Sequence, residues 1–371
     1  MFVCYIAHQP YQDAQLYPDL HKIALNGQVR FLKSRTMSPK KKNVTIRDIA
    51  KLANVSYQTV SLVLNNKPGV SEKTRKRILR LMAEQDYRPN LAAQTLNTNR
   101  SHTLELIYVD VNYGGRLADS TNDMVRTAAA AGYSLLVSVT DAISLGTALD
   151  RAASRSVDGV IIHAPRLQIA DDDLLALCKG MPLVRRDYTP GSRLAWVGFD
   201  QQYATQLAVK HLIQLGHRQI AAIPPETDIL NGYWRYTAWK NVLLEHNLTP
   251  GPAAFGDYST HSAYKAAQHI IDSGAVFTAV VVGTDNMALG AIRAFHERGL
   301  RVPADVSLVS FDNTEIADYL EPPLTTVDFK FVKQEEIAVQ FLLELIANPE
   351  IELHQRVLPA TLVVRQSTRQ L

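Results

Sequence analysis

Residues 45–66 are the part of the sequence that most constrains the fold. Apolar side chains recur there at helical spacing in two short segments, separated by four residues that are too few for anything but a turn. The apolar positions are Ile46, Ile49, Ala50 and Ala53 in the first segment, and Val60, Val63 and Leu64 in the second. Ser56 precedes the second segment and can cap it through its hydroxyl. The pattern predicts two short crossed helices, a helix-turn-helix.

Polar residues occupy the N-terminal end of the second predicted helix, namely Tyr57, Gln58 and Thr59. In a DNA-binding helix-turn-helix, this end enters the major groove, where polar side chains reach base edges. A plain helical hairpin is the alternative explanation of the same pattern.

Charge is unevenly distributed along the chain. Residues 37–100 hold 13 Lys and Arg against four Asp and Glu, a surplus of nine, whereas the whole chain is only +3. The residues beyond 100 are therefore net acidic, and a basic head on an acidic body indicates a polyanion partner for the head. A solvated helix face would not explain why the surplus ends near Arg100.

Length and composition narrow the class of protein. A chain of 371 residues is too long for one ordinary core and fits one small and two medium domains. No apolar run approaches the ~18 residues needed to span a bilayer, and the N-terminus lacks the features of a secretory signal. Cys4 and Cys178 share no metal-ligand spacing, so we expect reduced thiols, no metal and a cytoplasmic location.

Residues 1–36 show neither a helical nor a strand period. Met37 is followed by Ser-Pro-Lys-Lys-Lys, which is typical of the start of a DNA-binding arm. We therefore expect residues 1–36 to be a non-functional N-terminal extension.

A third helix and a short helical segment are expected after the first two helices. Residues 65–69 form a turn by composition, and Ser71 caps a helix that runs to about Gln85. Its expected buried stripe consists of Val70, Ile78, Leu79 and Met82. After a helix stop at residues 87–90, segment 91–96 is too short to be a stable helix alone and needs a partner helix and a surface.

From residue 103 the pattern changes to alternating strands and helices, which indicates α/β layers with parallel sheets. We expect buried parallel strands at 106–109, 134–139, 159–162, 220–223, 279–282 and 306–310. Helices are expected at 205–214, 235–245, 262–273 and 286–297. Ligands of such sheets bind at the carboxyl ends of the strands. Those ends are at residues 110–113, 163–165, 283–285 and 311–313.

From about Val44 to Ser367, the sequence resembles the lactose-repressor family of bacterial transcription regulators. Several independent motifs carry the resemblance in the same order along the chain. They are residues 44–50 followed by Val60-Ser61, then 56–61, 87–90, 211–212 with 215–217, 285–290 and 322–326.

The resemblance implies a small all-α helix-turn-helix head and a hinge helix, joined to a two-lobed α/β core like that of periplasmic binding proteins. It also implies a homodimer that binds a palindromic DNA operator and is controlled by a small-molecule effector. The expected domains are the head at 37–89, the hinge helix and linker at 90–101, and the core at 102–371. Within the core, the N-lobe spans about 102–199 and 329–358, and the C-lobe about 200–328 and 359–371.

Position by position, the resemblance implies a set of DNA-binding residues. They are Thr45, Ser56, Tyr57, Gln58, Thr59, Leu62, Asn65 and Leu96. Gln58 has the donor–acceptor pair that matches adenine, and Tyr57 can meet a base edge or a thymine methyl. Leu62 stands at the third reading position, where the family's type protein has an arginine, so the operator is expected to differ there. Leu96 falls on the hinge leucine that wedges into a base step, the alternative being a contact with its own core.

The resemblance also implies effector-binding residues in the core. They are Asp110, His163, Asn231, Arg235, Tyr258, Thr284, Asp312 and Phe329. Arg235 and Asp312 are expected to hold polar groups of the effector, and Tyr258 to supply an aromatic wall. The alternatives are a helix cap for an Asp that follows a strand, and a core histidine for His163. Residues 113–115 replace the family's usual Asn-Pro-Phe, so the resemblance does not assign the residues that line the N-lobe side of the pocket.

Three functions compete on the sequence alone. A ligand-controlled transcriptional regulator, which we expect to be a repressor, accounts for both head and core. A sugar-binding transport protein shares the core but not the basic head. A sugar-processing enzyme is the third possibility, but the sequence contains no nucleophile elbow, metal triad or phosphate loop. We therefore expect that the protein is not an enzyme and uses no cofactor.

The expected effector is a sugar or glycoside, with a purine or phosphosugar as the alternative. No leucine heptad follows the last expected strand near 362–365, which favours a dimer.

Overall fold

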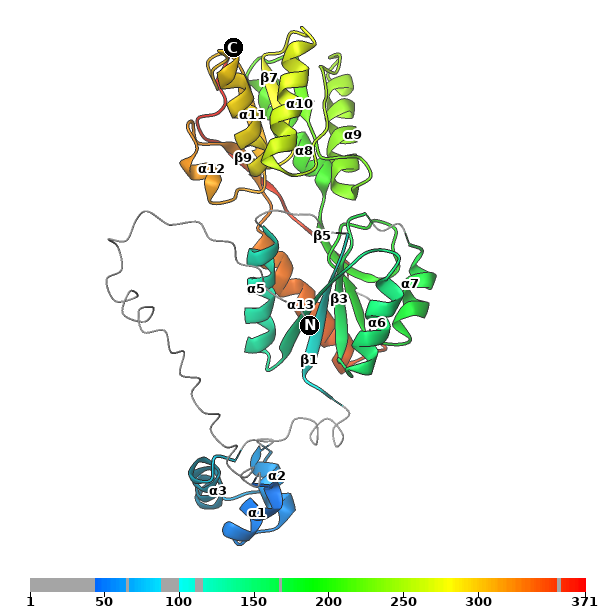
Figure 1. Cartoon of the computed structure of the whole chain (residues 1–371), viewed down its shortest axis with the longest axis vertical. Coiled ribbons are helices and arrows are strands. Elements are labelled where there is room, and N and C mark those ends of the chain that lie inside the picture. Colours follow the sequence, from blue (N-terminus) through cyan, green and yellow to red (C-terminus); the bar gives the residue numbers. More distant parts are fainter. Residues whose placement is uncertain (1–43, 65–66, 88–99, 111–115, 167–168, 352–354) are drawn as a thin grey trace, which may run out of the picture. The chain divides into compact units, whose positions relative to one another are not determined.

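The computed structural model describes residues 44–64, 67–87, 100–110, 116–166, 169–351 and 355–371. The chain divides into two compact units, residues 1–90 and 91–371, which we call the head and the core and describe separately (Figure 1). The expected extension at 1–36, the hinge segment 91–96 and Asn65 lie outside the described residues. In the part of the chain that is described, no helix is both long and apolar enough to cross a membrane.

The described part of the head contains three helices, and side-chain caps set where each begins. These are α1 (Ile46–Leu52), α2 (Tyr57–Leu64) and α3 (Glu72–Glu84). Thr45 forms a capping box with Asp48 at the start of α1. The Ser56 hydroxyl accepts from the backbone N–H of Thr59 at 3.1 Å, and Ser71 accepts from Thr74 at 3.3 Å. The helix-turn-helix and the third helix predicted from the sequence are confirmed.

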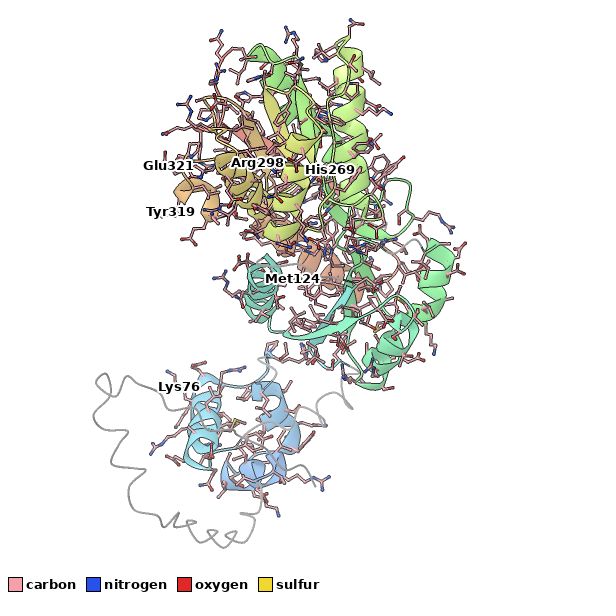
Figure 2. All side chains as sticks on the ribbon, turned by 45° about the horizontal axis from the view of Figure 1, so that its top comes forward. Lys76, Met124, His269, Arg298, Tyr319 and Glu321 are labelled. Atoms are coloured by element: carbon pink, nitrogen blue, oxygen red, sulfur yellow. The ribbon has the colours of Figure 1, made fainter. Side chains whose placement is uncertain are left out.

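A small apolar cluster holds the three head helices together. It consists of Ile49, Ala50, Ala53, Val60, Val63, Ile78 and Met82. The prediction for Leu79 was wrong: its side chain is 49% exposed. Ile78 and Met82 are four residues apart and share one face of α3, whereas Leu79 lies a 100° step round the helix. Lys76 on the same helix extends into solvent, with 77% of its side chain exposed (Figure 2).

The N-lobe of the core is built on a six-stranded, all-parallel sheet in the order β10-β5-β4-β3-β1-β2. Its strands are β1 (Thr103–Val109), β2 (Ser134–Thr140), β3 (Gly159–His163), β4 (Leu183–Arg185), β5 (Ala195–Phe199) and β10 (Gln355–Leu358). Its helices are α5 (Arg116–Ala130), α6 (Leu145–Ser154), α7 (Asp171–Cys178) and α13 (Phe331–Ala347). Helices α5 and α13 cover one face of this sheet, and α6 and α7 cover the other (Figure 1).

The C-lobe is built on a five-stranded sheet in the order β11-β9-β8-β7-β6, in which only β11 is antiparallel. Its strands are β6 (Ile220–Ile223), β7 (Ala279–Val282), β8 (Ser307–Phe311), β9 (Thr325–Asp328) and β11 (Thr361–Val363). Its helices are α8 (Gln201–Gln214), α9 (Leu230–Glu245), α10 (Thr260–Asp272), α11 (Asp285–Glu297) and α12 (Ile316–Tyr319). The predicted α/β architecture with parallel sheets is confirmed.

Several details differ from the sequence-based expectation, among them the start of α9, which lies at Leu230 rather than at residue 235. Strand β2 is not buried: it forms an edge of the sheet, and Val137 and Val139 are 44% and 67% exposed. Helix α8 begins at Gln201, four residues earlier than expected, because the Asp200 carboxylate caps the N–H groups of Gln202 and Tyr203. The short strands β4, β5, β9 and β10 were not predicted.

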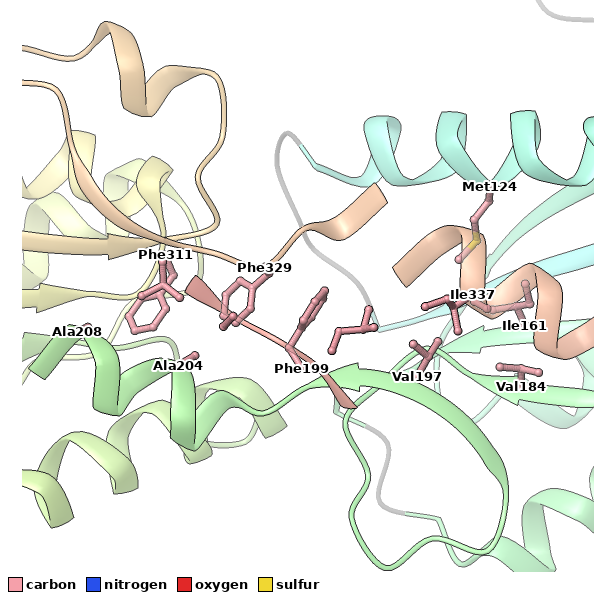
Figure 3. Packing of buried hydrophobic residues seen from close by; sticks show 14 of the residues in the cluster. Met124, Ile161, Val184, Val197, Phe199, Ala204, Ala208, Phe311, Phe329 and Ile337 are labelled. Atoms are coloured by element: carbon pink, nitrogen blue, oxygen red, sulfur yellow. The ribbon is translucent and has the colours of Figure 1, made fainter. Parts of the chain in front are cut away.

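The chain crosses between the two sheets three times, after β5, after β9 and between β10 and β11. One apolar cluster continues through these crossovers from the N-lobe to the C-lobe. At its centre Phe329 lies between Phe199 and Phe311, with ring centroids 5.0 and 6.2 Å away (Figure 3). The lobes therefore share a packed aromatic hinge.

Gly290 provides a test of how closely α10 and α11 pack. A Cβ atom there would lie 2.0 Å from the carbonyl oxygen of Thr260, a backbone atom that cannot move aside. Gly290→Ala should therefore lower the free energy of unfolding by about 1–3 kcal/mol, although alanine favours a helix. The matched control is Gly146→Ala in α6, where the new Cβ would lie 3.3 Å from a flexible leucine methyl. Urea unfolding measures both variants, and equal stabilities would contradict this packing.

Two histidines of the C-lobe hold the C-terminal segment of the chain, and burial lowers the pKa of both His211 and His217. His211 contacts the Thr368 hydroxyl at 3.1 Å, and His217 contacts the Arg369 carbonyl at 3.1 Å. Below the ordinary histidine pKa of about 6.5 the unfolded chain binds more protons than the folded one. Stability should therefore be full above pH ~6.5 and fall as the pH drops below it. The fall in thermal midpoint from pH 7.5 to 5.5 should be smaller in His211→Gln, and an unchanged fall would count against this assignment.

Candidate functional site

A cavity between the two lobes of the core encloses about 940 Å³ of space, its open mouth included. A cleft lined by residues of both lobes is the kind of place where small molecules bind. The lining residues from the N-lobe and its crossovers are Tyr108, Ser120, His163, Arg186, Asp187, Tyr188, Gly198, Phe199, Phe331 and Gln334. Those from the C-lobe are Gln201, Asn231, Arg235, Tyr258, Thr284, Asn286, Asp312 and Thr314. Six of the eight predicted effector residues are among them.

Arg235 is the most strongly held side chain of the C-lobe wall. Its guanidinium donates to the Gln201 side chain at 2.8 Å and to the Gly283 carbonyl, and lies 3.8 Å from the Asp312 carboxylate. It also lies over the Phe311 ring, 4.4 Å from the centroid. The residue is only 5% exposed, so these contacts fix the cation before any ligand arrives.

The remaining C-lobe residues surround this arginine. Asn231 and Arg235 are four residues apart on α9 and so share one helix face. Burial raises the pKa of Tyr258 to about 12, which keeps its phenol protonated, and its hydroxyl interacts with the Asn231 side chain. Thr284 both lines the cavity and caps α11, accepting from the N–H of Met287 at 3.1 Å.

The N-lobe wall carries a buried histidine–carboxylate pair and a buried arginine–carboxylate ion pair. His163 Nδ1 lies 2.9 Å from the Asp187 carboxylate. Burial acts to raise the pKa of Asp187, but the interaction with His163, the charge of Arg185 and the N–H of Ala164 together outweigh it and lower that pKa. Arg186 donates from Nε to Glu335 at 2.7 Å and makes a second bond to the same carboxylate. Burial works against the charge of Arg186, but the carboxylate prevails and raises its pKa.

Charges around the cavity are therefore balanced within the protein. Each charged lining group, Arg186, Asp187, Arg235 and Asp312, lies against a group of opposite charge or a histidine. Among the described residues there is no group of three or more His, Cys, Asp or Glu arranged to hold a metal ion. The wall offers mainly hydrogen-bonding groups and aromatic faces.

Two predicted effector residues lie outside the cavity lining. Asp110 follows β1, and its carboxylate accepts from the backbone N–H of Ala142 at 3.0 Å, which is a turn-capping role. Phe329 is fully buried in the aromatic hinge. The aromatic that lines the cavity after β9 is Phe331, two residues further along. Phe329 is drawn into the core because the chain turns immediately after β9.

Sequence reasoning missed several lining residues. Arg186 and Asp187 follow β4, a strand of three residues that ends in arginine and so shows no apolar run. Gln201 lies at the start of α8, which the Asp200 cap could have located. Gln334 gave no signal, because a glutamine inside a helix is ordinarily exposed.

The rim of the cleft also joins the two lobes. Arg166 of the N-lobe pairs with Asp228 of the C-lobe and lies 3.5 Å from Glu226. Nearby, the backbone N–H of Leu230 donates to the Pro165 carbonyl at 3.0 Å. These contacts hold one side of the cleft closed.

In the head, the predicted DNA-binding residues divide into two groups. Tyr57 and Gln58 are exposed at the start of α2, where their side chains can face a partner. Thr45 and Ser56 cap helices, Thr59 contacts the Ser56 hydroxyl, and Leu62 is half-buried. The two remaining residues, Asn65 and Leu96, lie outside the described residues.

Comparison with known proteins identifies both units. Residues 45–90 match the family described as bacterial regulatory proteins, lacI family, and residues 209–368 match a periplasmic binding protein-like domain. The chain is 33% identical to the lactose operon repressor of Escherichia coli (strain K12) over 337 residues, covering 88% of this chain and 91% of that protein. It is 29% identical to the HTH-type transcriptional repressor PurR of Haemophilus influenzae (strain PittEE), covering 88% and 98%.

Comparison with solved structures points to the same family. The Lac repressor dimer bound to operator and the anti-inducer ONPF matches with a TM-score of 0.80 and 33% identity, covering 88% of this chain and 100% of that one. The complex of the regulator CelR with cellobiose matches with a TM-score of 0.65 and 26% identity, covering 87% and 99%. This chain therefore belongs to the lacI family of bacterial transcriptional regulators, with a helix-turn-helix head and a periplasmic-binding-protein-like core.

Proposed function

We propose that this protein is a homodimeric repressor whose binding to a palindromic operator is controlled by an uncharged sugar or glycoside in the interlobe cavity. The observation that carries the effector class is the internal pairing of every charged lining group. A charged ligand would have to displace one of these buried pairs, which is costly. A polyhydroxylated neutral ligand needs only the hydrogen-bonding groups and rings that line the cavity.

Aromatic and polar lining groups favour a sugar over the alternatives. Tyr188, Tyr258 and Phe331 supply ring surfaces, while Asn231 and Asp312 supply hydrogen-bonding groups. Support also comes from CelR, which has been solved with cellobiose. A phosphosugar fits less well, because both arginines of the lining already have carboxylate partners. A purine is the second candidate, favoured by the ring surfaces, on which a flat base would stack.

Control of DNA binding follows from the position of the cavity. The effector would contact both lobes, so it would bias their relative angle about the aromatic hinge. In a dimer, a change of that angle would alter the spacing of the two hinge segments, residues 90–101, and so release or engage the heads. The N-lobe also exposes apolar side chains on α5 and on the edge strand β2, namely Val125, Leu136, Val137 and Val139, and such exposed apolar groups favour contact with a second copy of the chain.

Operator recognition gives a first test. Gln58→Ala should weaken binding to the best operator selected from random duplexes by about 1–3 kcal/mol, and weaken binding to random DNA far less. The reason is that base contacts carry sequence choice, whereas phosphate contacts carry most of the affinity. Gln85→Ala, at the exposed end of α3, is the control. Fluorescence anisotropy at fixed salt measures both, and an equal loss on both DNAs would place Gln58 away from the bases.

The effector class is tested by a ligand panel on the full chain. Galactose, glucose, lactose and cellobiose represent neutral sugars; glucose 6-phosphate, galacturonate and hypoxanthine represent the alternatives. We expect only neutral sugars to raise the melting temperature and to change operator affinity. Asp312→Ala should abolish the shift, because it removes an acceptor and frees Arg235, whereas Asp150→Ala on the N-lobe surface should not. A shift with hypoxanthine alone would transfer the proposal to purines.

A further inference from the structure

Two buried glutamines meet the cavity beside the interlobe crossovers. Gln201 begins α8, just after the chain leaves β5, and Gln334 lies in the first turn of α13, just after the chain returns from β9. Each is only 3% exposed, and both line the cavity. One belongs to each lobe, so a ligand that contacts both would bridge the hinge.

The orientation of each side-chain amide is fixed by its protein partner. Arg235 Nε can only donate, so the group 2.8 Å away must be the amide oxygen of Gln201. The Val197 carbonyl can only accept, so the group 3.0 Å away must be the amide NH₂ of Gln334. These assignments follow from partner chemistry alone and leave no ambiguity between amide oxygen and nitrogen.

The opposite end of each amide is available to a ligand. Within the described residues, no protein group hydrogen-bonds the NH₂ of Gln201 or the amide oxygen of Gln334. Gln201 therefore offers the cavity a donor, and Gln334 offers it an acceptor. Because both glutamines are buried, each of these groups would cost free energy if a bound ligand covered it without a partner.

Resting on the effector function proposed above, we propose that Gln201 and Gln334 together determine which effector the cavity binds. They select an uncharged effector through its hydroxyl groups, which donate and accept. A carboxylate or phosphate only accepts and would face the oxygen of Gln334. An ammonium only donates and would face the NH₂ of Gln201. Since the glutamines belong to different lobes, the same contacts tie effector binding to the lobe angle.

Calorimetric titration of the full chain with the neutral sugars of the panel tests this pair. Gln201→Leu and Gln334→Leu should each weaken binding of the best neutral sugar by about tenfold, the effect of one lost hydrogen bond. Gln202→Leu and Gln340→Leu are matched controls, because these glutamines are exposed on the same two helices. The controls should bind like the wild type.

Monodeoxy analogues of that sugar identify the contact itself. Loss of one particular hydroxyl should weaken binding to the wild type, and should cause no further loss in the variant whose glutamine contacted it. If a leucine variant does not fold, Gln201→Glu keeps an oxygen for Arg235 and Gln334→Met keeps the side-chain volume. Both substitutions remove the group offered to the ligand.

The outcomes separate this proposal from the effector class. If a neutral sugar binds but the glutamine variants bind it as tightly as their controls do, the proposed role of the two glutamines is wrong. The proposal of a sugar effector would still stand. The proposed role of the glutamines is also wrong if removal of each hydroxyl from the sugar weakens binding to the variants as much as it weakens binding to the wild type. If no neutral sugar binds at millimolar concentration, or a charged ligand binds better, the effector class and the pair both fail.

Discussion

The buried guanidinium of Arg235 is the interaction on which the organisation of the core depends. It lies over the ring of Phe311 and near that of Phe329, so it is part of the aromatic hinge between the lobes. It also donates to Gln201 and to the Gly283 carbonyl and faces Asp312, so it is part of the cavity wall. A buried cation is tolerated because several acceptors surround it. The hinge and the ligand site are therefore one packed unit.

This arrangement explains why the cavity is polar but electrically balanced. Arg235 requires Asp312, Arg186 requires Glu335, and Asp187 requires His163, because an unpaired charge at such depth would be costly. What remains for a ligand is the unused hydrogen-bonding capacity of these groups and of neutral amides and hydroxyls. Under the effector class proposed above, such a site would discriminate by hydrogen-bond pattern and shape rather than by net charge.

The head is stabilised by a small apolar core together with side-chain caps at its helix starts. Its core is small, with only seven buried apolar residues in the described part, and side-chain caps define where each helix begins. Capping leaves Tyr57 and Gln58 at the start of α2 with no role in the core. Exposed polar side chains at a helix N-terminus, in a strongly basic unit, are suited to DNA. The head therefore presents to a partner a surface that its own fold does not use.

The sequence by itself determined the elements that depend on local signals. Helical periodicity and the capping residues Ser56 and Ser71 located the head helices, and apolar runs located β6 and β7 to the residue. Parallel α/β alternation also indicated the carboxyl ends of β3 and β8 as ligand-binding positions, and it was the family resemblance that assigned His163 and Asp312 there to the effector. These features succeed because they are decided within a few residues of chain.

Tertiary structure decided what local signals do not contain. Strand β4 is three residues long and ends in charge, so only its neighbours in the sheet make it a strand, and Arg186 and Asp187 came with it. Phe329 and Phe331 have the same chemistry and touch each other, yet Phe329 is fully buried in the hinge and Phe331 also lines the cavity. Glu335 and Gln334 are ordinary surface residue types, yet partners about 140 residues away along the chain make them buried. Contacts between residues far apart in the chain decide which side chains meet, and the hydrophobic periodicity of the sequence contains no information about such contacts.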